Sequence, residues 1–167
     1  MVTILGIDPG AAAIGYGLVK VEDASKKIVL LNYGTIITPS DREDAFRLRI
    51  VEKSLSKIVR LYQPDILTVE SLYFFKNQKS VMSVSQTKGV ILLVAEKAQL
   101  PVYEFSPVEI KLILTGYGRA EKQEVQEAVQ KILKLDHKPE PDHAADALGT
   151  SLCFLIKNQW LDNSQGR

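Results

Sequence analysis

Two apolar segments of the chain end directly in a carboxylate. The run 2–7 is followed at once by Asp8, and the shorter run 66–69 is followed by Glu70. Burying an unpaired carboxylate in a core is costly, so an acid at the tip of a buried strand usually holds a metal ion, a substrate proton or a neighbouring base. For Asp8 taken alone, a turn or a helix N-cap is an equally good interpretation.

A third stretch, Asp142-His143-Ala144-Ala145-Asp146, adds an imidazole and further acids. His143 and Asp146 are three residues apart, so they share a face if the stretch is helical, and Asp142 and Asp146 are four apart and could share one too. The two alanines are small enough to let such a helix approach a sheet edge closely. Asp142 is interpreted first as the helix N-cap and second as a ligand, and His143 could also be a solvent-exposed residue.

Brought together, these groups would form a hard, oxygen-rich site with one imidazole. Such a site suits Mg²⁺ or Mn²⁺ better than Zn²⁺, and a cation would relieve the repulsion between neighbouring carboxylates. Two such ions about 4 Å apart activate a water and stabilise the leaving oxygen in phosphodiester hydrolysis. The site predicted here consists of Asp8, Glu70, His143 and Asp146.

The elements that must position this site follow from the hydrophobic pattern. We expect three strands joined by short loops, then alternating helices and strands, and finally three helices. The strands are expected near 2–7, 11–22, 28–37, 66–69 and 101–105, and the helices near 43–62, 78–98, 106–116, 121–133 and 142–160. The fold class is therefore α/β, with a mixed sheet of three antiparallel strands and two parallel ones between helices, and with Gly34 as a candidate β-bulge. A right-handed crossover through helix 43–62 would set strand 66–69 parallel beside the first strand, placing Asp8 and Glu70 side by side.

Composition narrows the class of protein. The 167 residues suit one domain, expected over 1–160, with a polar tail at 161–167 that we expect to be disordered. The net charge of +1 lacks the basic excess of many DNA-binding domains, so a nucleic-acid surface would have to be a local patch.

The single Cys153 excludes an internal disulfide and favours a reducing, cytoplasmic location. No apolar run is long enough to span a bilayer, so no membrane partner is expected. Helix 78–98 is apolar on more than one side, which predicts a subunit contact.

Together the motifs are specific enough to identify a family. They are Gly6-Ile7-Asp8-Pro9-Gly10 with Gly15-Tyr16-Gly17, Pro64-Asp65 leading to Glu70, Lys76-Asn77, Gly89-Val90, Ala120-Glu121-Lys122 and Ala144-Ala145-Asp146-Ala147-Leu148. With these motifs the chain resembles RuvC-type Holliday junction resolvases of the ribonuclease H-like superfamily. The resemblance extends from the N-terminal motif to about Phe154. The resemblance implies a ribonuclease H-like nuclease domain and a homodimer that works with the RuvA–RuvB branch-migration machinery. It also implies paired symmetric nicks in four-way junction DNA during recombination and repair, leaving 5′-phosphate and 3′-hydroxyl ends.

The same resemblance gives roles to individual residues. The family's four metal-site positions fall on Asp8, Glu70, His143 and Asp146, with Mg²⁺, or Mn²⁺ in its place, as two ions per site. Many family members carry Asp where this chain has His143, and an imidazole favours Mn²⁺ or could instead orient or deprotonate the attacking water.

DNA-facing positions are also implied. The stacking aromatic of the family falls on Tyr73, and two of its lysines near the scissile phosphate fall on Lys111 and Lys122. Further phosphate contacts are expected from Lys76, Lys88 and Arg119, whereas Phe74 is expected to pack or to contact the other subunit. Without the resemblance, Lys111 and Lys122 would be interpreted as a solvated helix face.

Three other functions compete with this one. An actin-like nucleotide-binding protein would need a second phosphate loop and a second half, for which the chain is too short. A junction-binding protein without cleavage would gain nothing from acids that face phosphates. A ribonuclease of the same fold is disfavoured by the aromatic loop that follows Glu70.

Overall fold

The computed structural model describes residues 1–22, 26–71 and 78–160. Its elements follow the predicted order, with helix and strand bounds within a few residues of those expected. They are β1 (Val2–Asp8), β2 (Ala13–Val21), β3 (Ile28–Ile37), α1 (Asp44–Tyr62), β4 (Ile66–Glu70), α2 (Gln78–Lys97), β5 (Val102–Phe105), α3 (Pro107–Thr115), α4 (Lys122–Leu133) and α5 (Asp142–Lys157).

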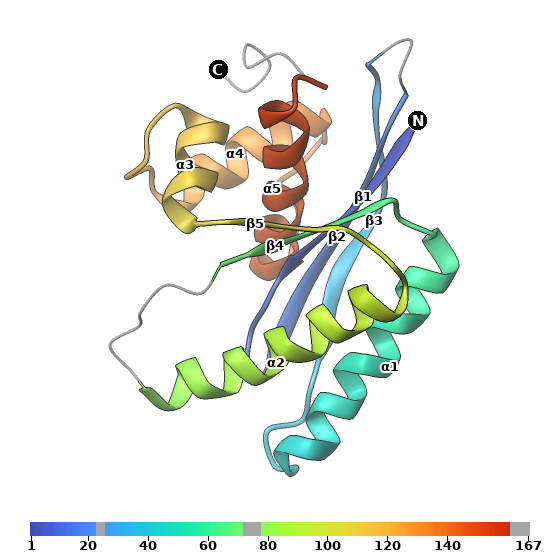
Figure 1. Cartoon of the computed structure of the whole chain (residues 1–167). Helices are drawn as coiled ribbons and strands as arrows, with labels where there is room; N and C mark the ends of the chain where they lie inside the picture. The colour runs from blue at the N-terminus through green and yellow to red at the C-terminus, as the bar shows by residue number, and fades with distance from the viewer. Residues whose placement is uncertain (23–25, 72–77, 161–167) are drawn as a thin grey trace.

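The strands of the described residues form one five-stranded sheet in the order β3-β2-β1-β4-β5 (Figure 1). β2 pairs antiparallel with β1 and with β3, whereas β4 pairs parallel with β1 and with β5. This confirms the predicted mixed sheet. β1 lies at its centre, because both faces of an apolar strand can then be covered.

Helices cover the two faces of the sheet unequally. On one face α1 and α2 pack over a core that includes Leu5, Ile7 and Leu67. On the other, α3, α4 and α5 enclose a core that includes Ile4 and Leu152. Neighbouring residues of β1 therefore serve opposite cores, as the alternation of side chains along a strand requires.

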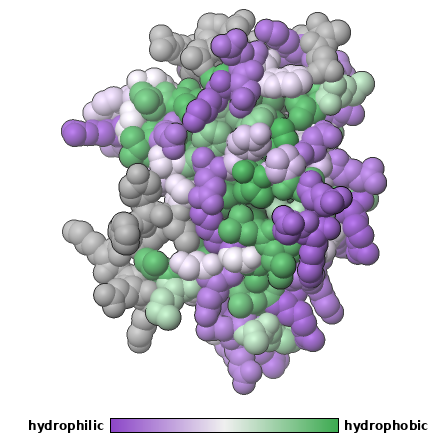
Figure 2. All heavy atoms as spheres, in the orientation of Figure 1, coloured by the Kyte–Doolittle hydropathy of each residue, from purple (hydrophilic) through white to green (hydrophobic). Residues whose placement is uncertain are grey.

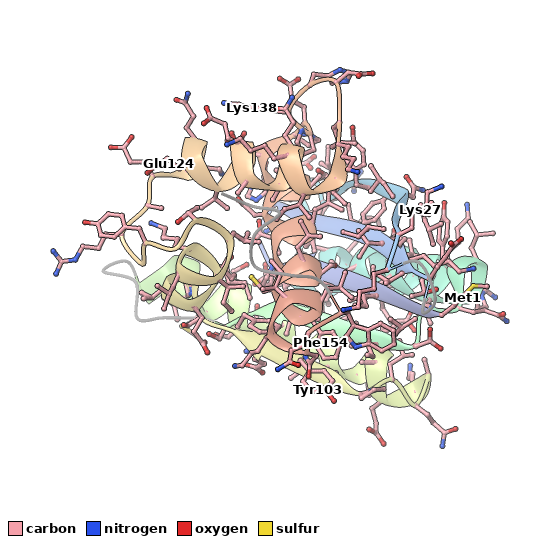
Figure 3. All side chains as sticks on the ribbon, turned by 90° about the horizontal axis from the view of Figure 1, so that it is seen from above. Met1, Lys27, Tyr103, Glu124, Lys138 and Phe154 are labelled. Atoms are coloured by element: carbon pink, nitrogen blue, oxygen red, sulfur yellow. The ribbon has the colours of Figure 1, made fainter. Side chains whose placement is uncertain are left out.

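Helix α5 is the most deeply buried helix of the described chain. Residues 144, 145 and 147–156 are all buried, and the helix contacts β1, β2 and β4. Its far end is fixed to the edge of the sheet, where the ring of Phe154 packs on that of Tyr103 in β5 with centroids 4.7 Å apart (Figure 3). Because α5 is packed along its length, its first turn is rigidly placed.

Two local predictions were wrong. The irregularity in the β2–β3 pair lies between Leu18 and Val19, opposite the extra residue Leu31, and not at Gly34. Gly34 instead makes room for the ring of Tyr16, whose hydroxyl would lie 2.8 Å from an added Cβ. The last helix ends at Lys157 rather than at residue 160. In the described part of the chain, no helix combines the length and apolarity that a membrane crossing needs.

Candidate active site

The two strand-end acids meet as the topology predicts. β1 and β4 run parallel with Ile7 opposite Val69, so Asp8 and Glu70 follow at the same end of adjacent strands. This end is where ligands bind in open α/β sheets. Hydrophobic pairing of the two strands therefore fixes the position of both carboxylates.

Close backbone contact brings α5 to the same edge. Gly15 lies opposite Asp8 in the β1–β2 pair, and a Cβ added there would overlap the carbonyl oxygen of His143. One turn further along α5, a Cβ at Gly6 would overlap the carbonyl oxygen of Ala147. Ala144 and Ala145, fully buried, complete this contact from the helix side, as predicted. The glycines on the strands are what allow the backbone of α5 to touch the sheet.

Three of the predicted ligands form a compact group. Atom Nδ1 of His143 lies 2.7 Å from Oδ2 of Asp8. One ligand atom each from Asp8, His143 and Asp146 lie within 4.8 Å of one another. Asp8 is 15% exposed and Asp146 is 23% exposed, so both acids are partly shielded from water while still open to a small ligand.

Glu70 lies beside this group, and the charges of the group affect its pKa. Burial, followed by the charges of Asp8 and Asp146, raises the pKa of Glu70 to about 7. Burial also raises the pKa of Asp8, and the charge of Asp146 adds to this effect, although the hydrogen bond with His143 works against it. Carboxylates perturbed in this way by one another are typical of sites that bind a cation or move a proton.

A lysine supplies the positive charge of the site. Nζ of Lys122, in the first turn of α4, lies 3.0 Å from a carboxylate oxygen of Asp146 and 3.3 Å from one of Asp142. Burial opposes the charge of Lys122, but its hydrogen bonds and attraction to Asp146 and Asp142 outweigh this and raise its pKa. The lysine that the resemblance placed near the scissile phosphate thus lies against a predicted ligand.

A cavity of about 190 Å³ opens beside these groups. Its polar lining comes from Glu70, Lys111, Lys122 and Asp146, and its apolar wall from α3 and α4. Two acids and two lysines therefore line a space large enough for a small anionic group. Lys111 therefore lines the cavity beside Glu70, and its contact with the scissile phosphate stays a prediction.

Asp142 has a different role from the one expected. Pro141 is the N-cap of α5 and makes no side-chain cap, so Asp142 is the first residue of the helix rather than its cap. Its carboxylate accepts a hydrogen bond of 2.8 Å from Nε2 of Gln126. That bond and the ion pair with Lys122 lower the pKa of Asp142. Asp142 therefore helps to hold Lys122, because a proline at the cap leaves the acid free to reach α4.

Sequence reasoning missed a buried polar contact beneath the site. The hydroxyl oxygens of Thr68 and Thr150 lie 3.0 Å apart, and Thr150 donates to the carbonyl oxygen of Ala147. Both threonines are completely buried. Strand alternation places Thr68 on the same face as Glu70, two residues later, and this was the signal that could have found it. The contact ties β4 directly to α5.

Of the other predicted DNA-facing residues, the described ones, Lys88 and Arg119, are not part of the cavity lining. Arg119 is exposed in the loop before α4. Lys88 is only 15% exposed and forms an ion pair of 2.7 Å with Glu104 of β5, so its charge is already neutralised. Tyr73, Phe74 and Lys76 lie outside the described residues.

The donor set fits a hard divalent cation. Three of its four members offer carboxylate oxygens and the fourth a single imidazole, and no thiolate takes part. The raised pKa values of Asp8 and Glu70 point the same way, because a divalent cation would offset both the cost of burying these carboxylates and the smaller repulsion from neighbouring acids.

Comparison with known proteins identifies the family of this chain. The family model described as "Crossover junction endodeoxyribonuclease RuvC" matches residues 4–154. A protein of that name from Caldanaerobacter subterraneus subsp. tengcongensis is 42% identical over 159 residues, covering 95% of each chain. A second, from Petrotoga mobilis, is 45% identical over 150 residues, covering 90% of this chain and 91% of the relative.

A solved structure shares both fold and sequence with this chain. The structure of Thermus thermophilus RuvC in complex with Holliday junction substrate superposes with a TM-score of 0.89 at 30% identity. The match covers 95% of this chain and 96% of the other.

Proposed function

The chain belongs to the RuvC family of crossover junction endodeoxyribonucleases, and from this premise we propose how its acidic site resolves four-way DNA junctions. The observation that carries the proposal is the meeting of Asp8, His143 and Asp146 within 4.8 Å, beside a Glu70 whose pKa is raised to about 7. The reaction is hydrolysis of one phosphodiester in each of two opposed strands, leaving 5′-phosphate and 3′-hydroxyl ends.

The four ligands would hold two Mg²⁺ ions, or Mn²⁺ in their place. Bound there, such ions supply an activated water and stabilise the leaving oxygen. Glu70 must release a proton to become a ligand, because its pKa of about 7 leaves it partly protonated near neutral pH. His143 uses Nδ1 toward Asp8, so Nε2 is the nitrogen left to bind an ion or to orient a water.

Lys111 and Lys122 supply positive charge for the phosphate. Lys122 keeps Asp146 in place and, together with Lys111, presents positive charge to the cavity beside Glu70. Preorganised cations of this kind stabilise the charge that develops on a phosphoryl group in the transition state. A protein that only binds junctions would not need this set of acids, because carboxylates near phosphates weaken binding.

Two opposed cuts require two sites, and α2 offers a surface for a second copy. Met82, Leu92 and Leu93 are 66%, 36% and 51% exposed, and a Cβ added at Gly89 would meet no atom within 4 Å. Figure 2 shows hydrophobic side chains gathered in the centre of the face on which α2 lies. Exposed apolar patches of this kind mark interaction surfaces. The proposal is therefore a homodimer joined through α2.

The proposal extends to the cellular setting by family membership. The protein would act on junctions in the cytoplasm, during recombination and repair, together with the RuvA–RuvB branch-migration complex. A cleavage assay with the purified partner complex tests that partnership. Purified RuvA–RuvB bound to a junction should stimulate cutting by this protein, and an unchanged cutting rate would remove the partner from the proposal.

Cleavage of a synthetic four-way junction tests the central proposal. The unmodified protein is expected to make symmetric nicks in Mg²⁺ and in Mn²⁺. Asp146→Asn should bind the junction without cutting it, and His143→Asp should retain activity because a carboxylate can replace the imidazole as a ligand. Binding without cutting by the unmodified protein in either metal would show that the catalytic site has been wrongly assigned.

A further inference from the structure

The outer face of α1 carries a row of cations that have no acidic partner in the described part of the chain. Arg49, Lys53 and Arg60 follow one another at spacings of four and seven residues and are all exposed. Arg42 before the helix and Lys57 beside the row extend it, and we call these five residues the α1 basic stripe. These spacings repeat every one or two helical turns, so the stripe runs along the helix on one side.

The stripe combines its regular spacing with a lack of acidic partners among the described residues, which it shares with isolated cations such as Lys131 and Lys134. Arg47 on the same helix pairs with Asp44, and Lys88, Lys97, Lys122, Lys138 and Lys157 all pair with acids. Among the described residues, none of the five cations of the stripe has a carboxylate within ion-pair distance. Glu52, the acid between Arg49 and Lys53, is turned to Lys97. The stripe therefore offers unneutralised positive charge in a protein whose net charge is only +1.

An aromatic ring orders one end of the stripe. The guanidinium groups of Arg42 and Arg49 lie 5.8 Å and 5.1 Å from the ring centroid of Phe46, which is itself 39% exposed. Contact with the same ring restrains both guanidinium groups before any partner arrives. This arrangement favours a partner that two arginines contact at once.

The stripe begins at the active-site end of the sheet. The backbone N–H of Thr38 donates to the carbonyl oxygen of Ala12, and Arg47 donates to that of Ala11, in the loop that leaves Asp8. From there α1 runs along the sheet toward the opposite end (Figure 1). Figure 2 shows the lower right of the molecule, over α1, as predominantly hydrophilic.

We infer that the α1 basic stripe is a second DNA surface, which binds the phosphate backbone of a junction arm away from the point of cutting. This inference rests on the proposed function, which brings a branched duplex to the adjacent end of the sheet. From Arg42 to Arg60 the stripe is about 27 Å long at 1.5 Å per residue. That length corresponds to about eight base pairs at 3.4 Å each, so several phosphates can meet several cations. An acidic protein is the other class of partner, but a linear row at helical spacing matches a regular polyanion better.

Substitution of the row by neutral residues tests the inference. Arg49→Gln/Lys53→Gln/Arg60→Gln is compared with Lys26→Gln/Lys131→Gln/Lys134→Gln, which removes the same charge away from α1. Junction affinity is measured against salt concentration with the full-length protein. The stripe variant should lower the magnitude of the slope of log K against log salt by about 0.9 for each phosphate that it no longer neutralises, and weaken binding about tenfold or more. The control variant should leave both close to those of the unmodified protein, and both variants should cut at the unmodified rate when saturated with junction.

The outcomes separate this inference from the proposed function. Failure of the unmodified protein to cut a junction that it binds would count against the proposed function alone, because the binding comparison is still decisive for the stripe. Equal salt slopes and equal affinities for the two triple variants would overturn the inference that the stripe binds DNA. An acidic protein partner for the stripe would give this same result. Failure of the unmodified protein to bind a junction at all would overturn both.

Discussion

Gly15 and His143 touch backbone to backbone. The strand residue has no Cβ, and a methyl group placed there would occupy the position of the carbonyl oxygen of His143. His143 and Asp146 both lie in the first two turns of α5. The absence of a side chain at Gly15 of β2 therefore determines how closely both predicted ligands approach the sheet. The active site therefore depends on a residue that takes no part in the chemistry.

Gly15→Ala should separate catalysis from binding. The added methyl group forces the start of α5 away from β2, and a displacement of about 1 Å at reacting groups can cost about a hundredfold in rate. We expect a loss in kcat of that order with junction affinity nearly unchanged, measured by single-turnover cleavage and by gel shift. Gly118→Ala is the matched control, because its Cβ would lie 3.2 Å from Cγ1 of Val108, an exposed side chain that needs to move by only a few tenths of an ångström. A normal kcat for Gly15→Ala would show that α5 can move without harm.

Glu70 should make the metal-free protein less stable as the pH rises. Between its ordinary pKa near 4.5 and its raised value of about 7, the folded protein keeps a proton that the unfolded chain has lost. Unfolding free energy contributed by this group is therefore fully present below pH 4.5 and falls as the pH rises through 7, by on the order of 3 kcal/mol.

Glu70→Gln isolates this effect. Urea unfolding in the presence of a chelator should show the variant gaining stability relative to the unmodified protein as the pH rises from about 4.5 to about 7. Glu96→Gln, at an exposed position of α2, is the control. Parallel curves for Glu70→Gln and the unmodified protein would mean that neither burial nor the neighbouring acids raise the pKa of Glu70 in the folded protein.

Lys122 should affect metal binding and cutting in opposite directions. Its ammonium group neutralises Asp146 and Asp142 at 3.0 and 3.3 Å, so Lys122→Gln leaves more negative charge for a divalent cation. We expect tighter Mn²⁺ binding by calorimetry, together with a kcat lowered about a hundredfold or more, because the ammonium group no longer stabilises the transition state. Lys138→Gln removes a similar ion pair, with Glu127, away from the site and should change neither quantity. Weaker Mn²⁺ binding in Lys122→Gln would indicate that the lysine orders the ligands instead of competing for them.

Leu93→Glu should break the proposed dimer. The side chain is 51% exposed on the outer face of α2, so a charge there leaves the protomer fold intact while placing two carboxylates in the dimer contact. Light scattering at micromolar concentration should show a dimer for the unmodified protein and a monomer for the variant, with paired cutting replaced by single nicks. Leu61→Glu, at a residue 68% exposed on α1, should remain dimeric. A dimeric Leu93→Glu would move the contact elsewhere.

The sequence alone predicted the fold and the meeting of the acids, for a physical reason. An apolar run that ends in a carboxylate fixes where a strand stops, and parallel pairing then brings Asp8 and Glu70 together whatever the loops do. The contacts of Lys122 and Lys88 could not be predicted in this way. The sequence around each lysine does not show that Lys122 of α4 pairs with Asp146 of α5. Nor does it show that Lys88 of α2 pairs with Glu104 of β5. The role of Asp142 was mistaken for a related reason, because the partner that draws its carboxylate away from the cap lies on another helix.

The hydrogen bond between Asp8 and His143 joins residues 135 positions apart. A ribosome must therefore finish almost the whole chain before the last helix can dock on the first strand and complete the catalytic group. Contacts of such long sequence separation also form late in folding, because the loop between them must close first. A nascent or truncated chain that ends before α5 would have the sheet and two carboxylates but no complete site. The order of the elements thus makes the catalytic group complete only after α5 has been synthesised.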